Sequence, residues 1–288
     1  MSNLNPHRLT IDIGIQLRLW DHGGDGVPVL FLHGYLDNGR SFDALVQQLS
    51  IPIRALCLDW RGHGESQWIG AGGSYHILDH LKDLHLVMNW LDENQMTPKA
   101  IVAHSMGGNI ASMLAGIRPD AIQSLFLLDA LLPPAEPPEE QPNRLANLLH
   151  NWGRYKPFRS FDSINDAANR LMQTNIGLSR EGALRMVQHA LKPDPNEEHR
   201  LCFRLDPRLR GPTPVRYPES MWLNLCRRIQ ARVHLLRSSQ GYVAMDETTT
   251  ARLDAIPQSS HHTVDHVGHH LHVEDPELIA KALQEFMS

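Results

Sequence analysis

Cysteine is scarce in this chain of 288 residues, and the three cysteines present are widely separated. Cys57, Cys202 and Cys226 form an odd set without a C-x-x-C motif, which argues against a disulfide framework and favours reduced thiols in a cytosol-like compartment. A chain of this length can bury about 75% of the surface that its unfolded state exposes, so a stable core requires neither disulfides nor a structural metal ion.

An excess of positive charge is also lacking, and so are long hydrophobic runs. The net charge is −5, which argues against a nucleic-acid-binding body, because such a body presents a basic surface. No stretch approaches the ~18 uninterrupted apolar residues that span a bilayer. Residues 1–8 contain no apolar core of a secretory signal. We therefore expect a cytoplasmic protein without membrane insertion and without a nucleic-acid partner.

Short apolar runs alternate with helical patterns along most of the chain. Six runs predict strands that helices cover on both faces: 27–32, 54–58, 100–103, 124–128, 233–236 and 263–267. Two earlier segments, 9–13 and 16–20, predict an antiparallel hairpin at the sheet edge. Apolar stripes over 77–91 and 278–286 predict helices, the second of which begins with Pro276 after an Asp275 cap. The alternation predicts an α/β fold with a doubly wound, mostly parallel eight-stranded sheet.

Residues 132–218 interrupt this alternation. They contain 12 of the 19 prolines, and their 13 Lys/Arg against 10 Asp/Glu give a local net charge of +3, which leaves −8 for the rest. Amphipathic segments over 144–152, 164–174 and 180–191 predict a small helical insertion. We therefore expect a core made of residues 1–131 and 219–288, with an inserted helical cap at 132–218.

Ser105 lies in the segment Ala103-His-Ser-Met-Gly107, between an apolar strand and a helical pattern. This is the context of a nucleophile elbow, a G-x-S-x-G turn that exposes a serine hydroxyl above the sheet. Ala103 replaces the first glycine and is still small enough for the strand and the helix to approach closely. A serine in an ordinary tight turn is the alternative interpretation, but the strand-to-helix context favours Ser105 as a nucleophile.

The loop His33–Asn38 follows the apolar strand at 27–32. An oxyanion hole needs two backbone N–H donors that point to the place where negative charge develops. Met106, directly after the serine, is expected to supply one donor, and Tyr35 in this loop the other. Gly34 alone would not distinguish the loop from an ordinary glycine-containing turn.

Histidines are dense near the end of the chain. The set comprises His261, His262, His266, His269, His270 and His272. A histidine in the loop after the last strand can lie over the sheet and take the proton of Ser105, and we expect His269 to be this base. A metal site is the alternative for the cluster, but its spacings do not repeat at i, i+4 on one predicted helix. We therefore expect no metal.

A further motif, Asp59-Trp-Arg-Gly-His-Gly-Glu-Ser66, matches the D-x-R-G-x-G-x-S loop of the α/β-hydrolase superfamily. Together with the three elements above, it makes nearly the whole core resemble that superfamily. The run Leu32–Phe42 is similar to animal serine hydrolase-like proteins. The resemblance implies an α/β-hydrolase fold, a cap that roofs the pocket and a structural role for the 59–66 loop, with no catalytic role for His63. The serine at position 105 separates the chain from haloalkane dehalogenases and epoxide hydrolases, whose nucleophile is an aspartate.

The position of the catalytic acid in this sequence departs from the usual pattern of the superfamily. Most members carry it shortly after the seventh strand, but here Ser238-Ser-Gln-Gly-Tyr242 follows that strand, and the first carboxylate is Asp246. A minority of members place the acid after the sixth strand, where this chain has Asp129 and keeps the order Ser…Asp…His. The acid holds the histidine tautomer and stabilises the imidazolium. We favour Asp129 and keep Asp246 as the alternative.

These features predict a serine hydrolase that cleaves an ester-type bond of a small molecule, without a cofactor, as a monomer or homodimer. The alternatives are a non-catalytic ligand-binding module on the same fold, or a C–C hydrolase or cofactor-free perhydrolase with the same triad. The excess of arginine in 132–218 suggests an acidic substrate. Four aromatic side chains of this segment could line its pocket or pack within the cap: Trp152, Tyr155, Phe158 and Phe161.

Overall fold

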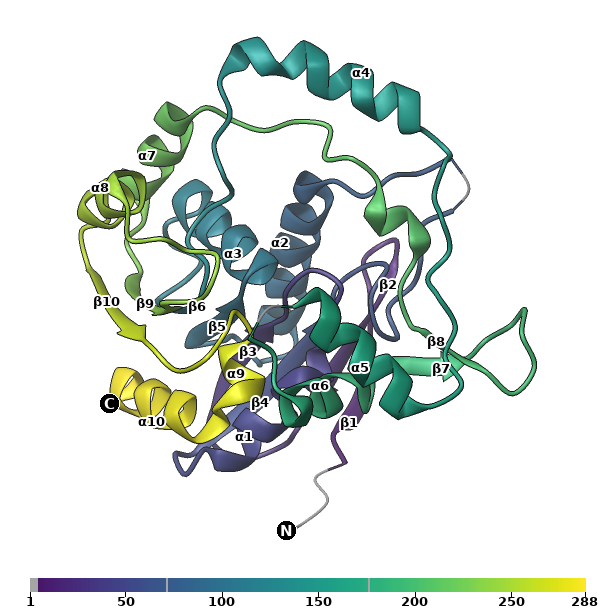
Figure 1. Cartoon of the computed structure of the whole chain (residues 1–288). Helices are drawn as coiled ribbons and strands as arrows, with labels where there is room; N and C mark the ends of the chain where they lie inside the picture. Colours follow the sequence, from purple (N-terminus) through teal and green to yellow (C-terminus); the bar gives the residue numbers. More distant parts are fainter. Residues whose placement is uncertain (1–4, 71, 176) are drawn as a thin grey trace.

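A computed structural model describes residues 5–70, 72–175 and 177–288. An eight-stranded sheet lies at the centre, in the order β1-β2-β4-β3-β5-β6-β9-β10 (Figure 1). Its strands are β1 (His7–Asp12), β2 (Gln16–Asp21), β3 (Val27–Leu32), β4 (Ile53–Asp59), β5 (Ala100–His104), β6 (Ser124–Leu128), β9 (Arg232–Ser238) and β10 (Ser259–Val264). Strand β2 is antiparallel to β1 and β4, and the other pairs are parallel. The expected mostly parallel eight-stranded sheet is confirmed.

Helices cover both faces of the sheet and bury two separate hydrophobic clusters. One face packs against α2 (Ile77–Glu93), α3 (Met106–Ile117), α7 (Glu219–Arg228) and α8 (Glu247–Ala255). The other packs against α1 (Asp43–Gln48) and α10 (Pro276–Met287). Within the described ranges, no helix is long and apolar enough to cross a membrane. The arrangement explains why most strands read as continuous apolar runs, because each face of the sheet is covered.

The last strand lies earlier than the sequence pattern predicts. The structure has β10 at Ser259–Val264 instead of residues 263–267, paired in parallel with β9. This strand is at the edge of the sheet, and its first four residues, Ser259 to His262, are exposed. An edge strand needs no apolar run, so the hydrophobic pattern of β10 is weak. The predicted strand therefore lies too late in the chain, over the more apolar residues that follow.

The segment 132–218 contains strands as well as helices, whereas the sequence predicts a helical insertion. It contains η2 (Pro138–Glu140), α4 (Gln141–Asn151), α5 (Ile164–Thr174), α6 (Arg180–Val187), β7 (Leu191–Pro193), β8 (Leu201–Phe203) and η3 (Pro207–Arg210). Strands β7 and β8 form an antiparallel pair of three residues each, too short to produce a periodic signal. Helices α5 and α6 lie together, whereas α4 lies apart at the top of Figure 1. The small hydrophobic core around α5 and α6 includes Phe161. It also includes Val273, which belongs to α9 (Leu271–Glu274), so the segment packs beside the loop that carries His269.

Candidate active site

Ser105 occupies a strained turn between β5 and α3. Its φ of 50° and ψ of −117° are unusual for a residue with a side chain, and such a conformation costs about 1–3 kcal/mol. The turn is tight because two glycines follow. A Cβ at Gly107 would overlap the backbone oxygens of Leu32 and His33, and one at Gly108 would overlap Ala130. The glycines therefore let the first turn of α3 approach the strand ends, which positions the serine at its N-terminus.

His269 lies between β10 and α9 and faces Ser105. Its Nε2 is 2.9 Å from Ser105 Oγ, and its Nδ1 is 2.6 Å from Asp129 Oδ2. A carboxylate only accepts hydrogen bonds, so Nδ1 carries the proton and donates to Asp129. Nε2 is then the acceptor for the Ser105 hydroxyl. The structure thus brings together the predicted serine, histidine and aspartate in one hydrogen-bonded chain.

Asp129 directly follows β6, with a φ of 47°. Besides His269, its carboxylate accepts hydrogen bonds from the backbone N–H groups of Ser238 (3.3 Å) and Tyr242 (2.7 Å), both in or after β9. Asp246 lies elsewhere. It is exposed and caps α8, where it accepts a bond from the Thr249 N–H at 2.8 Å. Of the two candidate acids, Asp129 is the one in contact with His269.

Two contacts around His269 have no clear sequence signal. The ring of Tyr242 lies over its ring with a centroid separation of 4.0 Å, and Tyr242 is otherwise 72% exposed. On the other side, the buried His104 ring lies 4.6 Å from it and contacts the His269 carbonyl oxygen through Nε2 at 3.0 Å. His104 occupies a variable position of the serine motif, so only the fold reveals that it supports the histidine loop.

The loop after β3 packs directly on the serine turn. A Cβ at Gly34 would fall about 3 Å from atoms of His104 and Ser105, so only glycine permits this approach. The next residue, Tyr35, lines the same cavity as Met106. The Leu36 amide is already used, because it donates to His63 Nε2 at 3.2 Å. The loop thus places Tyr35 and Met106, the two residues expected to form the oxyanion hole, around one space.

The 59–66 loop holds the structure together around β4. Asp59 accepts hydrogen bonds from backbone or side-chain N–H groups of Gly39, Glu65 and Trp20. His63 is fully buried and bonds the Arg61 carbonyl oxygen through Nδ1, and burial lowers its pKa well below the usual value. It is a neutral, structural side chain at physiological pH. The expectation that this loop is structural agrees with these contacts.

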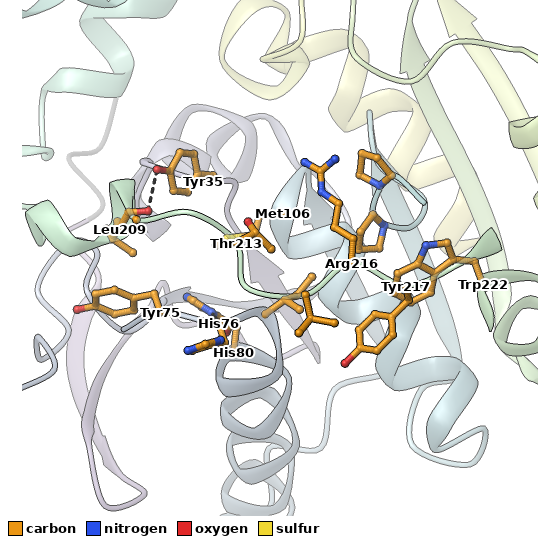
Figure 2. A pocket seen from close by; sticks show the side chains of 15 residues that line it. Tyr35, Tyr75, His76, His80, Met106, Leu209, Thr213, Arg216, Tyr217 and Trp222 are labelled. Atoms are coloured by element: carbon orange, nitrogen blue, oxygen red, sulfur yellow. Dashed lines mark hydrogen bonds between the residues drawn. The ribbon is translucent and has the colours of Figure 1, made fainter. Parts of the chain in front are cut away.

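A cavity of about 370 Å³ opens beside Met106 (Figure 2). Its lining comes from the loop after β3, the residues before and at the start of α2, the start of α3, the segment 132–218 and α7: Tyr35, Tyr75, His76, Ile77, His80, Met106, Pro133, Pro134, Leu209, Gly211, Thr213, Val215, Arg216, Tyr217 and Trp222. The Tyr35 hydroxyl donates to the Leu209 carbonyl oxygen at 3.0 Å and so ties the loop to the other wall.

None of the four aromatic side chains that could either line the pocket or pack within the segment belongs to this lining. Trp152 is 46% exposed and Phe161 packs in the core of α5 and α6. Tyr155 lies next to Gly211, and Phe158 lines a smaller cavity of about 160 Å³ beside Asp37. The segment 132–218 does form one wall of the cavity beside Met106, through Pro133 and Pro134 at its start and through residues from Leu209 onward at its end.

Comparisons with known proteins identify the fold family of the chain. A family described as alpha/beta hydrolase fold matches residues 27–276. A serine hydrolase-like protein of Danio rerio is 25% identical over 273 residues, which cover 91% of this chain and 82% of that protein. An esterase of Mycobacterium tuberculosis is 32% identical over 152 residues, 51% of this chain and 48% of its own. The crystal structure of a hypothetical protein from Pseudomonas aeruginosa PAO1 has 31% identity and a TM-score of 0.86, with 97% of each chain covered. The resemblance drawn from the motifs is confirmed.

Proposed function

Because the chain belongs to the α/β-hydrolase fold family, we propose that it is a serine hydrolase that cleaves a carboxylic ester or thioester of a small molecule. The observation that carries the proposal is the chain of hydrogen bonds from Ser105 to His269 and on to Asp129. An esterase among the relatives supports the same reaction class. The reaction needs no cofactor, because nucleophile, base and acid are all side chains.

In the proposed mechanism, Ser105 Oγ attacks the carbonyl carbon of the substrate while His269 Nε2 takes the hydroxyl proton. The carbonyl oxygen becomes an oxyanion, which accepts hydrogen bonds from the backbone N–H groups of Tyr35 and Met106. Asp129 keeps the proton on Nδ1 and stabilises the imidazolium without taking the proton itself. His269 then protonates the leaving alkoxide or thiolate, which leaves an acyl group on Ser105.

Water completes the cycle. His269 Nε2 takes a proton from a water molecule, which attacks the acyl carbon, and the second tetrahedral intermediate collapses to a carboxylic acid. The proton returns to Ser105 Oγ as the acyl–oxygen bond breaks. The strained turn at Ser105 holds Oγ beside His269 Nε2 at the end of the sheet for both attacks.

We further propose that residues 132–218 act as a cap over the cavity and select the substrate. Leu209, Thr213 and Arg216 of this segment line the cavity together with Tyr35 and Met106 of the core (Figure 2). The lining is mainly apolar and aromatic, which suits a small acyl or alkyl group.

The test is labelling of the purified protein with a fluorophosphonate probe, combined with turnover of a short p-nitrophenyl ester. Stoichiometric labelling is expected, with loss of label and of turnover in Ser105→Ala. The exposed Ser220→Ala, on α7, is the matched control and should keep both. An unlabelled and inactive protein that melts cooperatively would overturn the proposal and leave a ligand-binding module. Labelling that survives in Ser105→Ala would assign the nucleophile elsewhere.

A further inference from the structure

Three buried polar side chains converge beside the triad, and the proposed hydrolysis does not use them. Asp37 comes from the loop after β3, His104 ends β5, and His270 follows His269 in the loop before α9. They are 3%, 1% and 7% exposed. Asp37 Oδ1 or Oδ2 and a ring nitrogen of each histidine all lie within 4.8 Å of one another. Two loops and the end of β5 thus bring potential metal ligands to one point.

The hydrogen bonds of these histidines fix which ring nitrogen is free. His104 Nε2 faces the His269 carbonyl oxygen at 3.0 Å, and His270 Nε2 faces Asn175 Oδ1 at 3.0 Å. Both partners are acceptors, since Asn175 Nδ2 is itself donating to the Leu171 carbonyl oxygen. Each Nε2 therefore carries a proton, and each Nδ1 has a free lone pair.

These lone pairs have no donor. Across the described ranges, His104 Nδ1, His270 Nδ1 and Asp37 Oδ1 are buried without a hydrogen-bond partner. Asp37 Oδ2 is held by the Ser41 hydroxyl at 2.8 Å, which leaves Oδ1 as the free oxygen. Buried acceptors without a donor are costly. One water molecule has two protons and can serve two acceptors at most, whereas a cation serves all three.

We propose that Asp37, His104 and His270 form a binding site for a divalent transition-metal ion of the Zn²⁺ type. Two imidazole nitrogens and one carboxylate oxygen are a ligand set that Zn²⁺ and Co²⁺ favour. The outer partners also fit, because Asn175, the His269 carbonyl and Ser41 orient the three ligands as second-layer hydrogen bonds do in metal sites. A Cβ at Gly34 would fall 2.8 Å from His104 Nδ1, so the glycine keeps space beside that nitrogen.

Binding would draw the ligands together and connect three separate segments of the chain. With metal–ligand distances of about 2.1 Å, tetrahedral neighbours lie roughly 3.4 Å apart, so atoms separated by up to 4.8 Å must approach by up to about 1.4 Å. The ion would then link the loop of Tyr35, the serine turn and the histidine loop. We expect it to stabilise the folded chain against heat, independently of any hydrolytic turnover.

The first experiment titrates chelator-treated protein with Co²⁺ and Zn²⁺ in the absence of substrate. One ion per chain is expected, with visible ligand-field absorption for Co²⁺ and a rise in Tm of several degrees. Asp37→Asn keeps the acceptor for Ser41, and His270→Gln keeps a polar side chain. Each should weaken binding at least tenfold. His266→Gln, in the same loop but exposed, is the matched control and should bind normally.

Unchanged affinity in Asp37→Asn and His270→Gln, or a loss confined to His266→Gln, would overturn the site, because surface histidines would then hold the ion. Absence of any binding would overturn it too. If the two variants fail to fold, crystals of the unmodified protein soaked in Zn²⁺ decide the matter through anomalous scattering. A peak among the three side chains supports the site, and a peak only elsewhere, or none, excludes it. No outcome depends on the proposed esterase activity.

Discussion

Gly241 packs directly against the carboxylate of Asp129. A Cβ at Gly241 would overlap both carboxylate oxygens, while the next residue, Tyr242, donates its backbone N–H to Oδ2 at 2.7 Å. The loop after β9 is where most members of the superfamily carry the acid. Here that loop has no catalytic acid of its own and instead encloses Asp129, which follows β6. The missing side chain at Gly241 leaves the space that the Asp129 carboxylate occupies.

Substitution Gly241→Ala should therefore impair the acid without removing it. Gly241 has no positive φ, so alanine fits the backbone and the damage is confined to the displaced carboxylate. We expect kcat/KM for a p-nitrophenyl ester to fall about 10- to 100-fold, since small misplacements of catalytic groups have effects of this size. Gly70→Ala is the control, because a Cβ there meets nothing within 4 Å. Equal rates for the two variants would contradict the interpretation that Gly241 leaves space for the Asp129 carboxylate.

Asparagine substitutions compare the two candidate acids directly. Asp129→Asn can no longer fix the His269 tautomer, and a fall in kcat of about 10³- to 10⁴-fold is expected. Asp246→Asn should have nearly wild-type kcat and stability, because asparagine caps a helix as well as aspartate does. Steady-state kinetics with one ester measures both. A larger loss in Asp246→Asn would show that the acid is not Asp129.

Arg216 should determine the preference for a negatively charged substrate. It lines the cavity beside Met106, whereas several other arginines of residues 132–218 are held in ion pairs, such as Arg144 with Glu136. Arg216→Gln should raise KM for an ester with a carboxylate about 10-fold at low salt and leave a neutral ester of equal size unchanged. Lys156→Gln, in the same segment, keeps the change in net charge but lies outside the lining. If both esters respond alike, the preference for an acidic substrate is wrong.

The sequence contains enough information to propose Ser105, His269 and Asp129, because each follows a strand of the parallel part of the sheet, and parallel strands end at one edge of the sheet. Asp129 can be chosen over Asp246 only weakly from sequence, since both follow strands. The decision comes from β6 and β9 being neighbours, which places the β9 loop around Asp129. Ring contacts such as His104 on His269 depend on tertiary packing and leave no periodic pattern.

Local pattern also fails where strands are short or exposed. Strands β7 and β8 have three residues each, and β10 has polar residues at the open edge of the sheet. None of these three strands shows the apolar run that identified β3 and β6. The cavity wall could not be predicted for a different reason. The part of the wall that comes from 132–218 consists mostly of irregular residues, such as Pro133, Thr213 and Arg216, which follow no periodic pattern.

Buried neutral histidines should make the fold sensitive to mild acid. Burial lowers the pKa of His33 to about 4 and that of His63 well below its usual value. Between pH 6.5 and 4, the unfolded chain binds protons at these histidines and the folded chain does not, so the free energy of unfolding falls as the pH falls. His33 alone contributes roughly 3 kcal/mol over this window.

Urea unfolding at several pH values between 7.5 and 5 measures this slope. His63→Gln, which can keep both hydrogen bonds of the ring, should reduce the difference in bound protons by about one. The exposed His261→Gln should leave it unchanged. A free energy of unfolding that is constant between pH 6.5 and 5 would contradict the assignment of His33 and His63 as neutral buried groups.

The buried pair of Arg61 and Asp83 should be strongly destabilised by loss of one partner. Arg61 Nε and Nη2 each lie 2.5 Å from an oxygen of Asp83, which is fully buried on α2. Asp83→Asn leaves the guanidinium without its counter-charge, and the free energy of unfolding should fall by about 3–5 kcal/mol. Asp79→Asn is the control. Its contact with Arg61 is 3.5 Å and partly exposed, so a loss below about 1 kcal/mol is expected.

The double variant Arg61→Met/Asp83→Leu removes both charges and should regain most of the stability lost in Asp83→Asn, because well-packed apolar side chains can replace a buried ion pair at little cost. Urea unfolding at pH 7.5 compares all four proteins. Equal losses in Asp83→Asn and Asp79→Asn would mean that water reaches the guanidinium. The arginine of the 59–66 motif would then not be explained by its pairing with α2.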